Sequence, residues 1–104
     1  MSIVFDPARL PTCRNWRNGN PLYDITAHVV FTPGQQRRDA SVRDGAANIT
    51  VPSDARGATV WFENTGIPGC QTWDSNQGAN YYFAALVPPL SWGRAALPAP
   101  SSPR

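Results

Sequence analysis

Two segments of this chain carry an apolar side chain at every second position. In residues 22–32, every second position from Tyr23 to Phe31 is apolar. Because successive side chains of a β-strand point to opposite faces, this pattern predicts a strand with one face in the core. Residues 58–64 alternate in the same way, and we expect Ala58, Val60 and Phe62 to face inward and Thr59, Trp61 and Glu63 to face outward.

The rest of the chain consists of short apolar segments separated by turn formers, without a helical period. Pro-Gly and Asp-Gly pairs mark tight turns, and Pro, Asn and Gly fill residues 9–21, which we expect to be a long ordered loop. The pattern predicts an all-β fold, a single two-sheet antiparallel β-sandwich of immunoglobulin-like or carbohydrate-binding-module-like type. We expect the remaining strands at 2–5, 35–43, 47–51 and 80–86. The strand at 35–43 is polar and should therefore lie at a sheet edge.

The C-terminal residues differ in composition from the rest, because prolines stand there among small residues. We therefore divide the chain into a β-sandwich domain, 1–87, and a Pro-rich C-terminal tail, 88–104. The tail is either a flexible linker or a segment that docks on its own domain or on a neighbouring copy. Docking would use its apolar residues, which are Leu90, Trp92 and Leu97.

Charge and cysteine content limit the partners and the compartment. The chain has 104 residues and a net charge of +2, which is too small for a nucleic-acid-binding face. No apolar run is long enough to insert across a membrane, and the N-terminus lacks the basic and apolar regions of a signal peptide. We expect Cys13 and Cys70 to form a disulfide, the alternative being two free thiols. The bond would indicate an extracellular or cell-surface protein, and free thiols a cytoplasmic one.

The side chains that enzymes use are sparse. The single histidine, His28, falls in the polar set of its strand, and neither cysteine lies in a pattern typical of a nucleophile or a zinc ligand. The acidic residues are scattered, so no pair is selected for glycoside hydrolysis. We expect no enzymatic activity, no cofactor and no metal. A calcium loop built on the alternate positions 74, 76, 78 and 80 is a weaker alternative, since only Asp74 among them is charged.

Residues 70–83 place small polar turn formers between two aromatic groups. Asp74, Ser75 and Asn76 can bond their own backbone and Gly78 can take a positive φ, which predicts a rigid loop that leads into an aromatic strand. Aromatic rings beside fixed amides suit sugars, which have apolar ring faces edged by hydroxyls.

This loop resembles a known signature. Trp-Asp-Ser-Asn-Gln-Gly-Ala-Asn-Tyr at 73–81 is similar to the Trp-Asp-Asn-Asn-x-Gly-x-Asn-Tyr of starch- and glycogen-binding modules, with Ser75 in place of the usual Asn. The resemblance implies sugar contacts on Trp73, on Tyr81 or Tyr82, and on Asn76 or Asn80. Alternation turns Tyr81 inward, so Tyr82 is the better stacking candidate.

A wider resemblance is to small bacterial β-sandwich domains of unknown function. It rests on Arg-Leu-Pro-x-Cys-Arg at 9–14, Trp-Phe-x-Asn at 61–64 and Gly-Cys-x-x-Trp-Asp-Ser at 69–75. It covers most of residues 4–86 and implies a fold without an activity.

The candidate ligand-binding residues combine the outward aromatic side chains with the polar side chains of the loop, and they are Trp61, Trp73, Asp74, Asn76, Asn80 and Tyr82. The alternative for two of the tryptophans, Trp16 and Trp73, is that they pack beside the disulfide and close the ends of the sandwich.

Three functions fit these features. The leading one is a non-catalytic, lectin-like module that binds a polysaccharide or glycan. The second is a structural or self-assembling subunit of an extracellular filament, shell or appendage, in which the tail docks on a neighbour. The third is an accessory module that binds another protein through its exposed aromatic residues.

Overall fold

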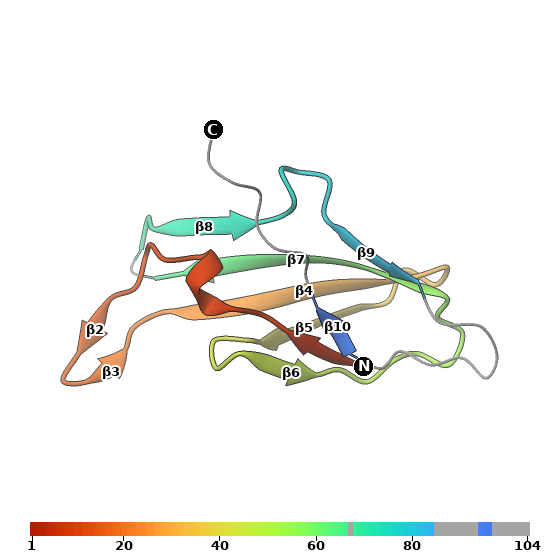
Figure 1. Ribbon diagram of the computed structural model, residues 1–104, viewed down its shortest axis with the longest axis horizontal. Helices are drawn as coiled ribbons and strands as arrows, with labels where there is room; N and C mark the ends of the chain where they lie inside the picture. Colours follow the sequence, from red (N-terminus) through yellow and green to blue (C-terminus); the bar gives the residue numbers. More distant parts are fainter. Residues whose placement is uncertain (67, 85–93, 97–104) are drawn as a thin grey trace.

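The two strands with the strictest alternation lie side by side in the centre of the larger sheet. The computed structural model describes residues 1–66, 68–84 and 94–96. In it, β4 (Asp24–Thr32) pairs antiparallel with β7 (Gly57–Thr65) along its whole length (Figure 1). The inward sets of both strands are buried, as predicted: Ile25, Ala27, Val29, Phe31, Ala58, Val60 and Phe62.

Three further strands complete this sheet over the described residues. β5 (Arg37–Ser41) pairs with β4 and forms one edge, which confirms the predicted polar edge strand. β8 (Gln71–Asp74) and β9 (Tyr81–Ala84) both pair with the other side of β7. We call the face of this sheet that packs on the core the inner face, and the opposite one the outer face.

β8 and β9 are two halves of one edge strand. Asp74 at the end of β8 faces Phe62, and Tyr81 at the start of β9 faces Val60. Residues 75–80 therefore leave the sheet where a single residue, Trp61, has no facing partner on this edge. The sequence predicted a loop from residue 70 to residue 79, before the strand at 80–86. The ordered turn is shorter because Gln71, Thr72 and Trp73 already pair with β7, and Thr and Trp favour strands.

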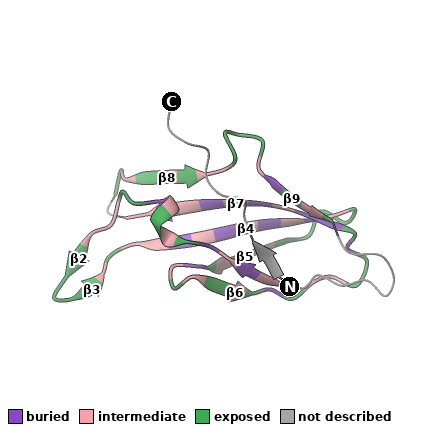
Figure 2. Cartoon of the chain, in the orientation of Figure 1, coloured by how far each residue is buried: buried purple, intermediate pink, exposed green. Residues whose placement is uncertain are grey.

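A second, smaller sheet covers the inner face. β1 (Ser2–Val4) pairs antiparallel with β6 (Ala46–Asn48). The ring of Phe5, just after β1, stacks on Phe62 with the ring centroids 4.3 Å apart. The two layers make the predicted β-sandwich, and buried residues run along β4 and β7 between them (Figure 2).

The C-terminal tail contributes a strand to the smaller sheet. β10 (Arg94–Ala96) pairs parallel with β1, so this part of the tail docks on its own domain. This differs from the flexible linker that the proline content suggested, and it is the one parallel pairing among the described strands. The tail anchors Leu90, Trp92 and Leu97 lie outside the described residues.

The N-terminal segment that the sequence predicted as a long loop contains regular structure. A short 3₁₀ helix, η1 (Pro7–Arg9), is followed by the hairpin strands β2 (Trp16–Arg17) and β3 (Asn20–Pro21). Asn18 and Gly19 between these strands have φ of 52° and 79°. Positive φ at both central residues is the geometry of a two-residue hairpin turn, and Asn-Gly favours it.

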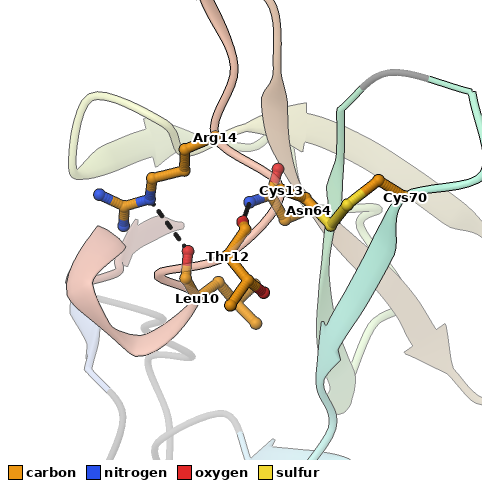
Figure 3. The surroundings of a disulfide bond; sticks show 6 residues. All are labelled: Leu10, Thr12, Cys13, Arg14, Asn64 and Cys70. Carbon is orange, nitrogen blue, oxygen red and sulfur yellow. Dashed lines mark hydrogen bonds between the residues drawn. A yellow bond between two sulfur atoms is a disulfide. The ribbon is translucent and has the colours of Figure 1, made fainter.

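A disulfide ties this segment to the start of β8 (Figure 3). Cys13 and Cys70 are bonded with their Cα atoms 5.6 Å apart, which bears out the expected pairing. Beside the bond, the buried Asn64 side chain donates from Nδ2 to the carbonyl of Thr12 at 2.6 Å. A Cβ at Gly66 would approach the Cys13 carbonyl oxygen to 2.5 Å, so glycine lets the two segments meet.

Candidate functional site

Three of the six candidate ligand-binding residues lie on the outer face of the larger sheet. Trp73 on β8 directly faces Glu63, and Tyr82 on β9 directly faces Thr59. Facing residues of antiparallel strands point to the same side of the sheet, and Trp61 lies between Thr59 and Glu63 on β7. We call Trp61, Trp73 and Tyr82 the aromatic face.

Two rings of the aromatic face, those of Trp73 and Tyr82, are exposed to solvent. Trp73 is 54% exposed and Tyr82 is 62% exposed, while Trp61 is partly buried. Trp16 is also exposed, so neither it nor Trp73 closes the core. The partners of Trp73 and Tyr82 are four residues apart on β7, which places the two side chains about 13 Å apart along the strand.

Trp61 is flanked by two nitrogen-bearing side chains. Its ring stacks on the imidazole of His28, its facing residue on β4, with centroids 5.4 Å apart. The guanidinium carbon of Arg37 lies 5.5 Å from the centre of the Trp61 ring, within the range of a cation–π contact. These contacts fix the orientation of the ring.

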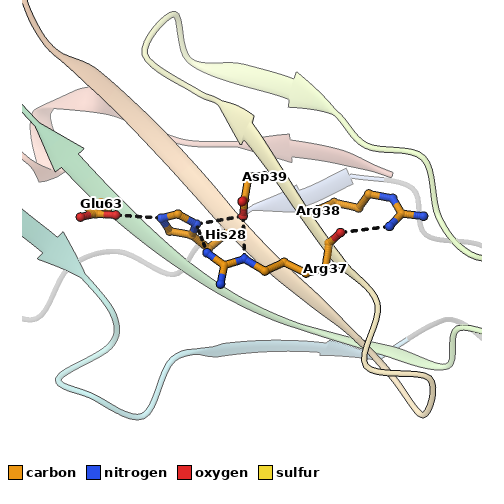
Figure 4. Close-up of polar contacts among 5 residues, drawn as sticks. All are labelled: His28, Arg37, Arg38, Asp39 and Glu63. Atoms are coloured by element: carbon orange, nitrogen blue, oxygen red, sulfur yellow. Dashed lines mark hydrogen bonds and ion pairs between the residues drawn. The ribbon is translucent and has the colours of Figure 1, made fainter.

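A row of polar contacts crosses the outer face beside Trp61 (Figure 4). His28 Nδ1 lies 2.9 Å from Asp39 Oδ1 on β5, and His28 Nε2 lies 3.0 Å from Glu63 Oε1 on β7. Gln71 on β8 extends the row by donating from Nε2 to Glu63 Oε2 at 2.8 Å. Arg37 Nε donates to Asp39 Oδ1 at 3.1 Å.

The row sets the charge state of Asp39. Partial burial acts to raise the pKa of this carboxyl, but hydrogen bonds and opposite charge from His28 and Arg37 outweigh it and hold the pKa below its ordinary value. Asp39 is therefore ionised at neutral and mildly acidic pH.

This lowered pKa predicts an acid-dependent contribution to stability. The folded pKa lies below the unfolded one, so the contribution is present above about pH 4 and is lost as the pH falls through the folded pKa. We expect the difference in unfolding free energy between the native protein and Asp39→Asn to be largest near pH 6 and to shrink below about pH 4. Urea unfolding from pH 2 to pH 6 measures it, with the exposed Asp54→Asn as control. A difference independent of pH would contradict the assignment.

Tyr82 owes its position to a glycine. A Cβ at Gly57, on the neighbouring strand β7, would lie 2.0 Å from the Tyr82 hydroxyl oxygen and 2.5 Å from its ring carbon Cζ. The Tyr82 ring therefore lies over the bare backbone of Gly57 and covers it, although much of the ring faces solvent.

Asp74, the fourth candidate, points to the opposite face of the sheet. Its carboxylate accepts from Arg9 Nε at 2.6 Å and from the Tyr81 hydroxyl at 2.5 Å, and Arg9 Nη2 lies 2.9 Å from the same hydroxyl. Burial and the Asp74 carboxylate raise the pKa of Tyr81. Burial acts to lower the pKa of Arg9. The hydrogen bond and the negative charge of Asp74 are stronger, so the pKa of Arg9 is raised. We call Arg9, Asp74 and Tyr81 the clamp, because they join the two ends of the 75–80 loop.

The loop between the clamp residues is closed by its own hydrogen bonds. The backbone amide of Asn80 donates to the Ser75 carbonyl at 2.7 Å, and Asn76 Nδ2 donates to the Asn80 carbonyl at 3.0 Å. Asn76, Gln77 and Asn80 have positive φ, as has Gly78. The loop is thus a hydrogen-bonded turn, as the sequence predicted, and the Asn76 amide nitrogen is used inside it.

Sequence comparison agrees with the wider of the two resemblances. The sequence model of a family of unknown function (DUF6209) matches residues 1–86 of this chain. The chain belongs to this family. No curated protein and no solved structure matches the chain significantly.

For this DUF6209 member, the structure separates two roles inside one motif. Trp73 and Tyr82 face outward, whereas Asp74 and Tyr81 hold the loop from inside. Sequence reasoning missed the partner of Asp74, Arg9, because the two are distant along the chain. It also missed the contact of His28 with Asp39 and Glu63, which depends on strand register.

Two further observations concern metals and membranes. Within residues 1–66, 68–84 and 94–96, no group of three or more His, Cys, Asp or Glu side chains is placed to hold a metal ion. The Asp74 carboxylate, which the calcium alternative requires, is bound to Arg9 and Tyr81. The same part of the chain contains no helix that is long and apolar enough to cross a membrane.

Proposed function

We propose that this protein is a non-catalytic carbohydrate-binding module whose ligand lies along the aromatic face. The observation that supports this proposal is the placement of Trp61, Trp73 and Tyr82 on one open side of a single sheet. The exposed rings of Trp73 and Tyr82 offer stacking area to the apolar faces of sugar units, and large aromatic side chains do so at little conformational cost.

Polar groups beside the rings would bond the sugar hydroxyls. Glu63 and Gln71 lie next to Trp73 on the outer face, and each has both a bond to the other and further hydrogen-bonding capacity. Asn80 remains a loop candidate, because its side chain makes no hydrogen bond within the described structure. Asp74 and Asn76 would act indirectly, by holding the loop between the two outer rings.

Such a face would bind each sugar chain weakly. Its two exposed rings lie on the face of a sheet, which buries less of a ligand than a deep pocket does. We expect affinities that become useful when several copies act on one polymer, since linked binding events raise the effective concentration. The disulfide supports an extracellular or cell-surface location for this activity.

Retardation in polysaccharide gels tests the proposal. We expect Trp73→Ala and Tyr82→Ala each to weaken binding to the retained polymer about tenfold, as loss of a stacking residue worth about 1.4 kcal/mol would. Trp16→Ala is the matched control, because Trp16 is equally exposed but lies on the β2–β3 hairpin. Unchanged retention of both variants, or equal loss in the control, would remove the aromatic face as the site.

A second variant tests whether the position of the Tyr82 ring matters, and not only its presence. Gly57→Ala keeps every aromatic residue but forces the Tyr82 ring to move. On this proposal its retention falls as far as that of Tyr82→Ala, while its circular dichroism spectrum is unchanged.

The alternative function is a structural or self-assembling subunit, and the pairing of β10 with β1 bears on it. The same pairing made by a neighbour's tail would be strand addition between copies. Light scattering of the full chain and of a variant that lacks residues 88–104 separates the functions. The assembly function requires a large species that disappears with the tail, and the carbohydrate function predicts the same monomer in both.

A further inference from the structure

His28 Nδ1 has two close neighbours of opposite hydrogen-bonding character. Asp39 Oδ1, which can only accept while it is ionised, lies at 2.9 Å, and Arg37 Nη2, which can only donate, lies at 2.8 Å. One ring nitrogen cannot serve both, because it donates when it carries a proton and accepts when it does not (Figure 4).

The neutral imidazole satisfies every group as the side chains stand. Nε2–H donates to Glu63 Oε1 at 3.0 Å, and the lone pair of Nδ1 accepts from Arg37 Nη2. Asp39 then receives its hydrogen bond from Arg37 Nε at 3.1 Å. In this state the guanidinium is held against the Trp61 ring.

A proton on Nδ1 reverses this arrangement. Nδ1–H donates to Asp39 Oδ1, which already lies within hydrogen-bond distance. Arg37 Nη2 then faces a donor and a second positive charge at a contact distance, so it loses its acceptor and is repelled.

We propose that protonation of His28 displaces Arg37 from Trp61 and so uncovers the central ring of the aromatic face in acid. The displacement itself is independent of the bound ligand. Its consequence for sugar affinity rests on the function proposed above.

The surroundings of His28 support this assignment. The charged groups that face it are Arg37 and Asp39 from β5 and Glu63 from β7, and its outer-face neighbours on its own strand, Thr26 and Val30, are uncharged. Arginine keeps its charge, and the lowered pKa of Asp39 keeps that carboxylate ionised in mild acid. Histidine is the side chain that ordinarily changes charge between pH 5 and 8.

Nuclear magnetic resonance of the ligand-free protein tests the displacement. As the pH is lowered, we expect the Arg37 δ protons, shifted upfield by the Trp61 ring, to move toward ordinary values on the same curve as the His28 ring protons. His28→Gln should hold the Arg37 shift constant over the same pH series. An Arg37 shift that stays constant while the His28 ring is protonated would overturn the proposal.

The functional consequence needs a separate measurement. On a polysaccharide that retains the protein, we expect about threefold tighter binding when His28 is protonated than when it is neutral, with the two states defined by the nuclear magnetic resonance titration, and no such ratio for His28→Gln. No retention at any pH would count against the carbohydrate function alone, because the nuclear magnetic resonance titration decides the displacement without a ligand. An equal pH ratio in the native protein and His28→Gln would overturn the link between the switch and the site.

Discussion

Replacing Cys13 and Cys70 together with alanine should lower the free energy of unfolding by about 4 kcal/mol, the value that the chain-entropy model gives for a loop of this length. This is a large share of the 5–15 kcal/mol that ordinary domains have. The bond joins the N-terminal segment to the start of β8; the ion pair of Arg9 with Asp74 also holds this segment to β8, and the Asn64 bond to Thr12 holds it to β7.

Urea unfolding with and without a reducing agent measures this effect. The reductant should destabilise the native protein to the level of the double variant and leave the double variant unchanged. Equal stability of the oxidised and reduced native protein would show that the bond does not hold the fold.

The second large effect is expected at the clamp. Asp74→Ala leaves the Arg9 guanidinium and the Tyr81 hydroxyl without their shared acceptor in a partly buried place, which should cost about 3 kcal/mol. Tyr81→Phe removes only one hydrogen-bonding group and should cost about 1 kcal/mol.

Thermal unfolding followed by circular dichroism compares these variants with Asp54→Ala, which removes a carboxylate that is exposed. The expected order of stability is Asp54→Ala, then Tyr81→Phe, then Asp74→Ala as the least stable. If Asp74→Ala were as stable as Asp54→Ala, the carboxylate would be free for another role, such as the ligand contact that the sequence resemblance implied.

The parts of the fold that could be predicted are those with a local signal. Ile25, Val29, Val60 and Phe62 repeat with a period of two, and this period alone identifies the core faces of β4 and β7. The outward direction of Trp61 and the inward direction of Tyr81 follow from the same rule.

The parts that could not be predicted depend on register between distant segments. Whether His28 faces Asp39 and Trp61 is decided by how β5 and β7 align on β4, and no residue near His28 carries that information. The parallel pairing of β10 was also hidden, because Arg94-Ala95-Ala96 is short and lacks the β-branched and aromatic residues that favour strands. Gly57 gave no signal of its own, since its role depends on a ring that arrives from β9.

The division of one edge strand into β8 and β9 has a consequence for solubility. Unpaired edges of sheets are templates on which other chains add strands and aggregate. Here the 75–80 loop interrupts the edge, so within the described residues it offers two short pieces, Gln71–Asp74 and Tyr81–Ala84, in place of one continuous ladder. The same turn that separates Trp73 from Tyr82 thus also shortens the continuous edge on which another chain could add a strand.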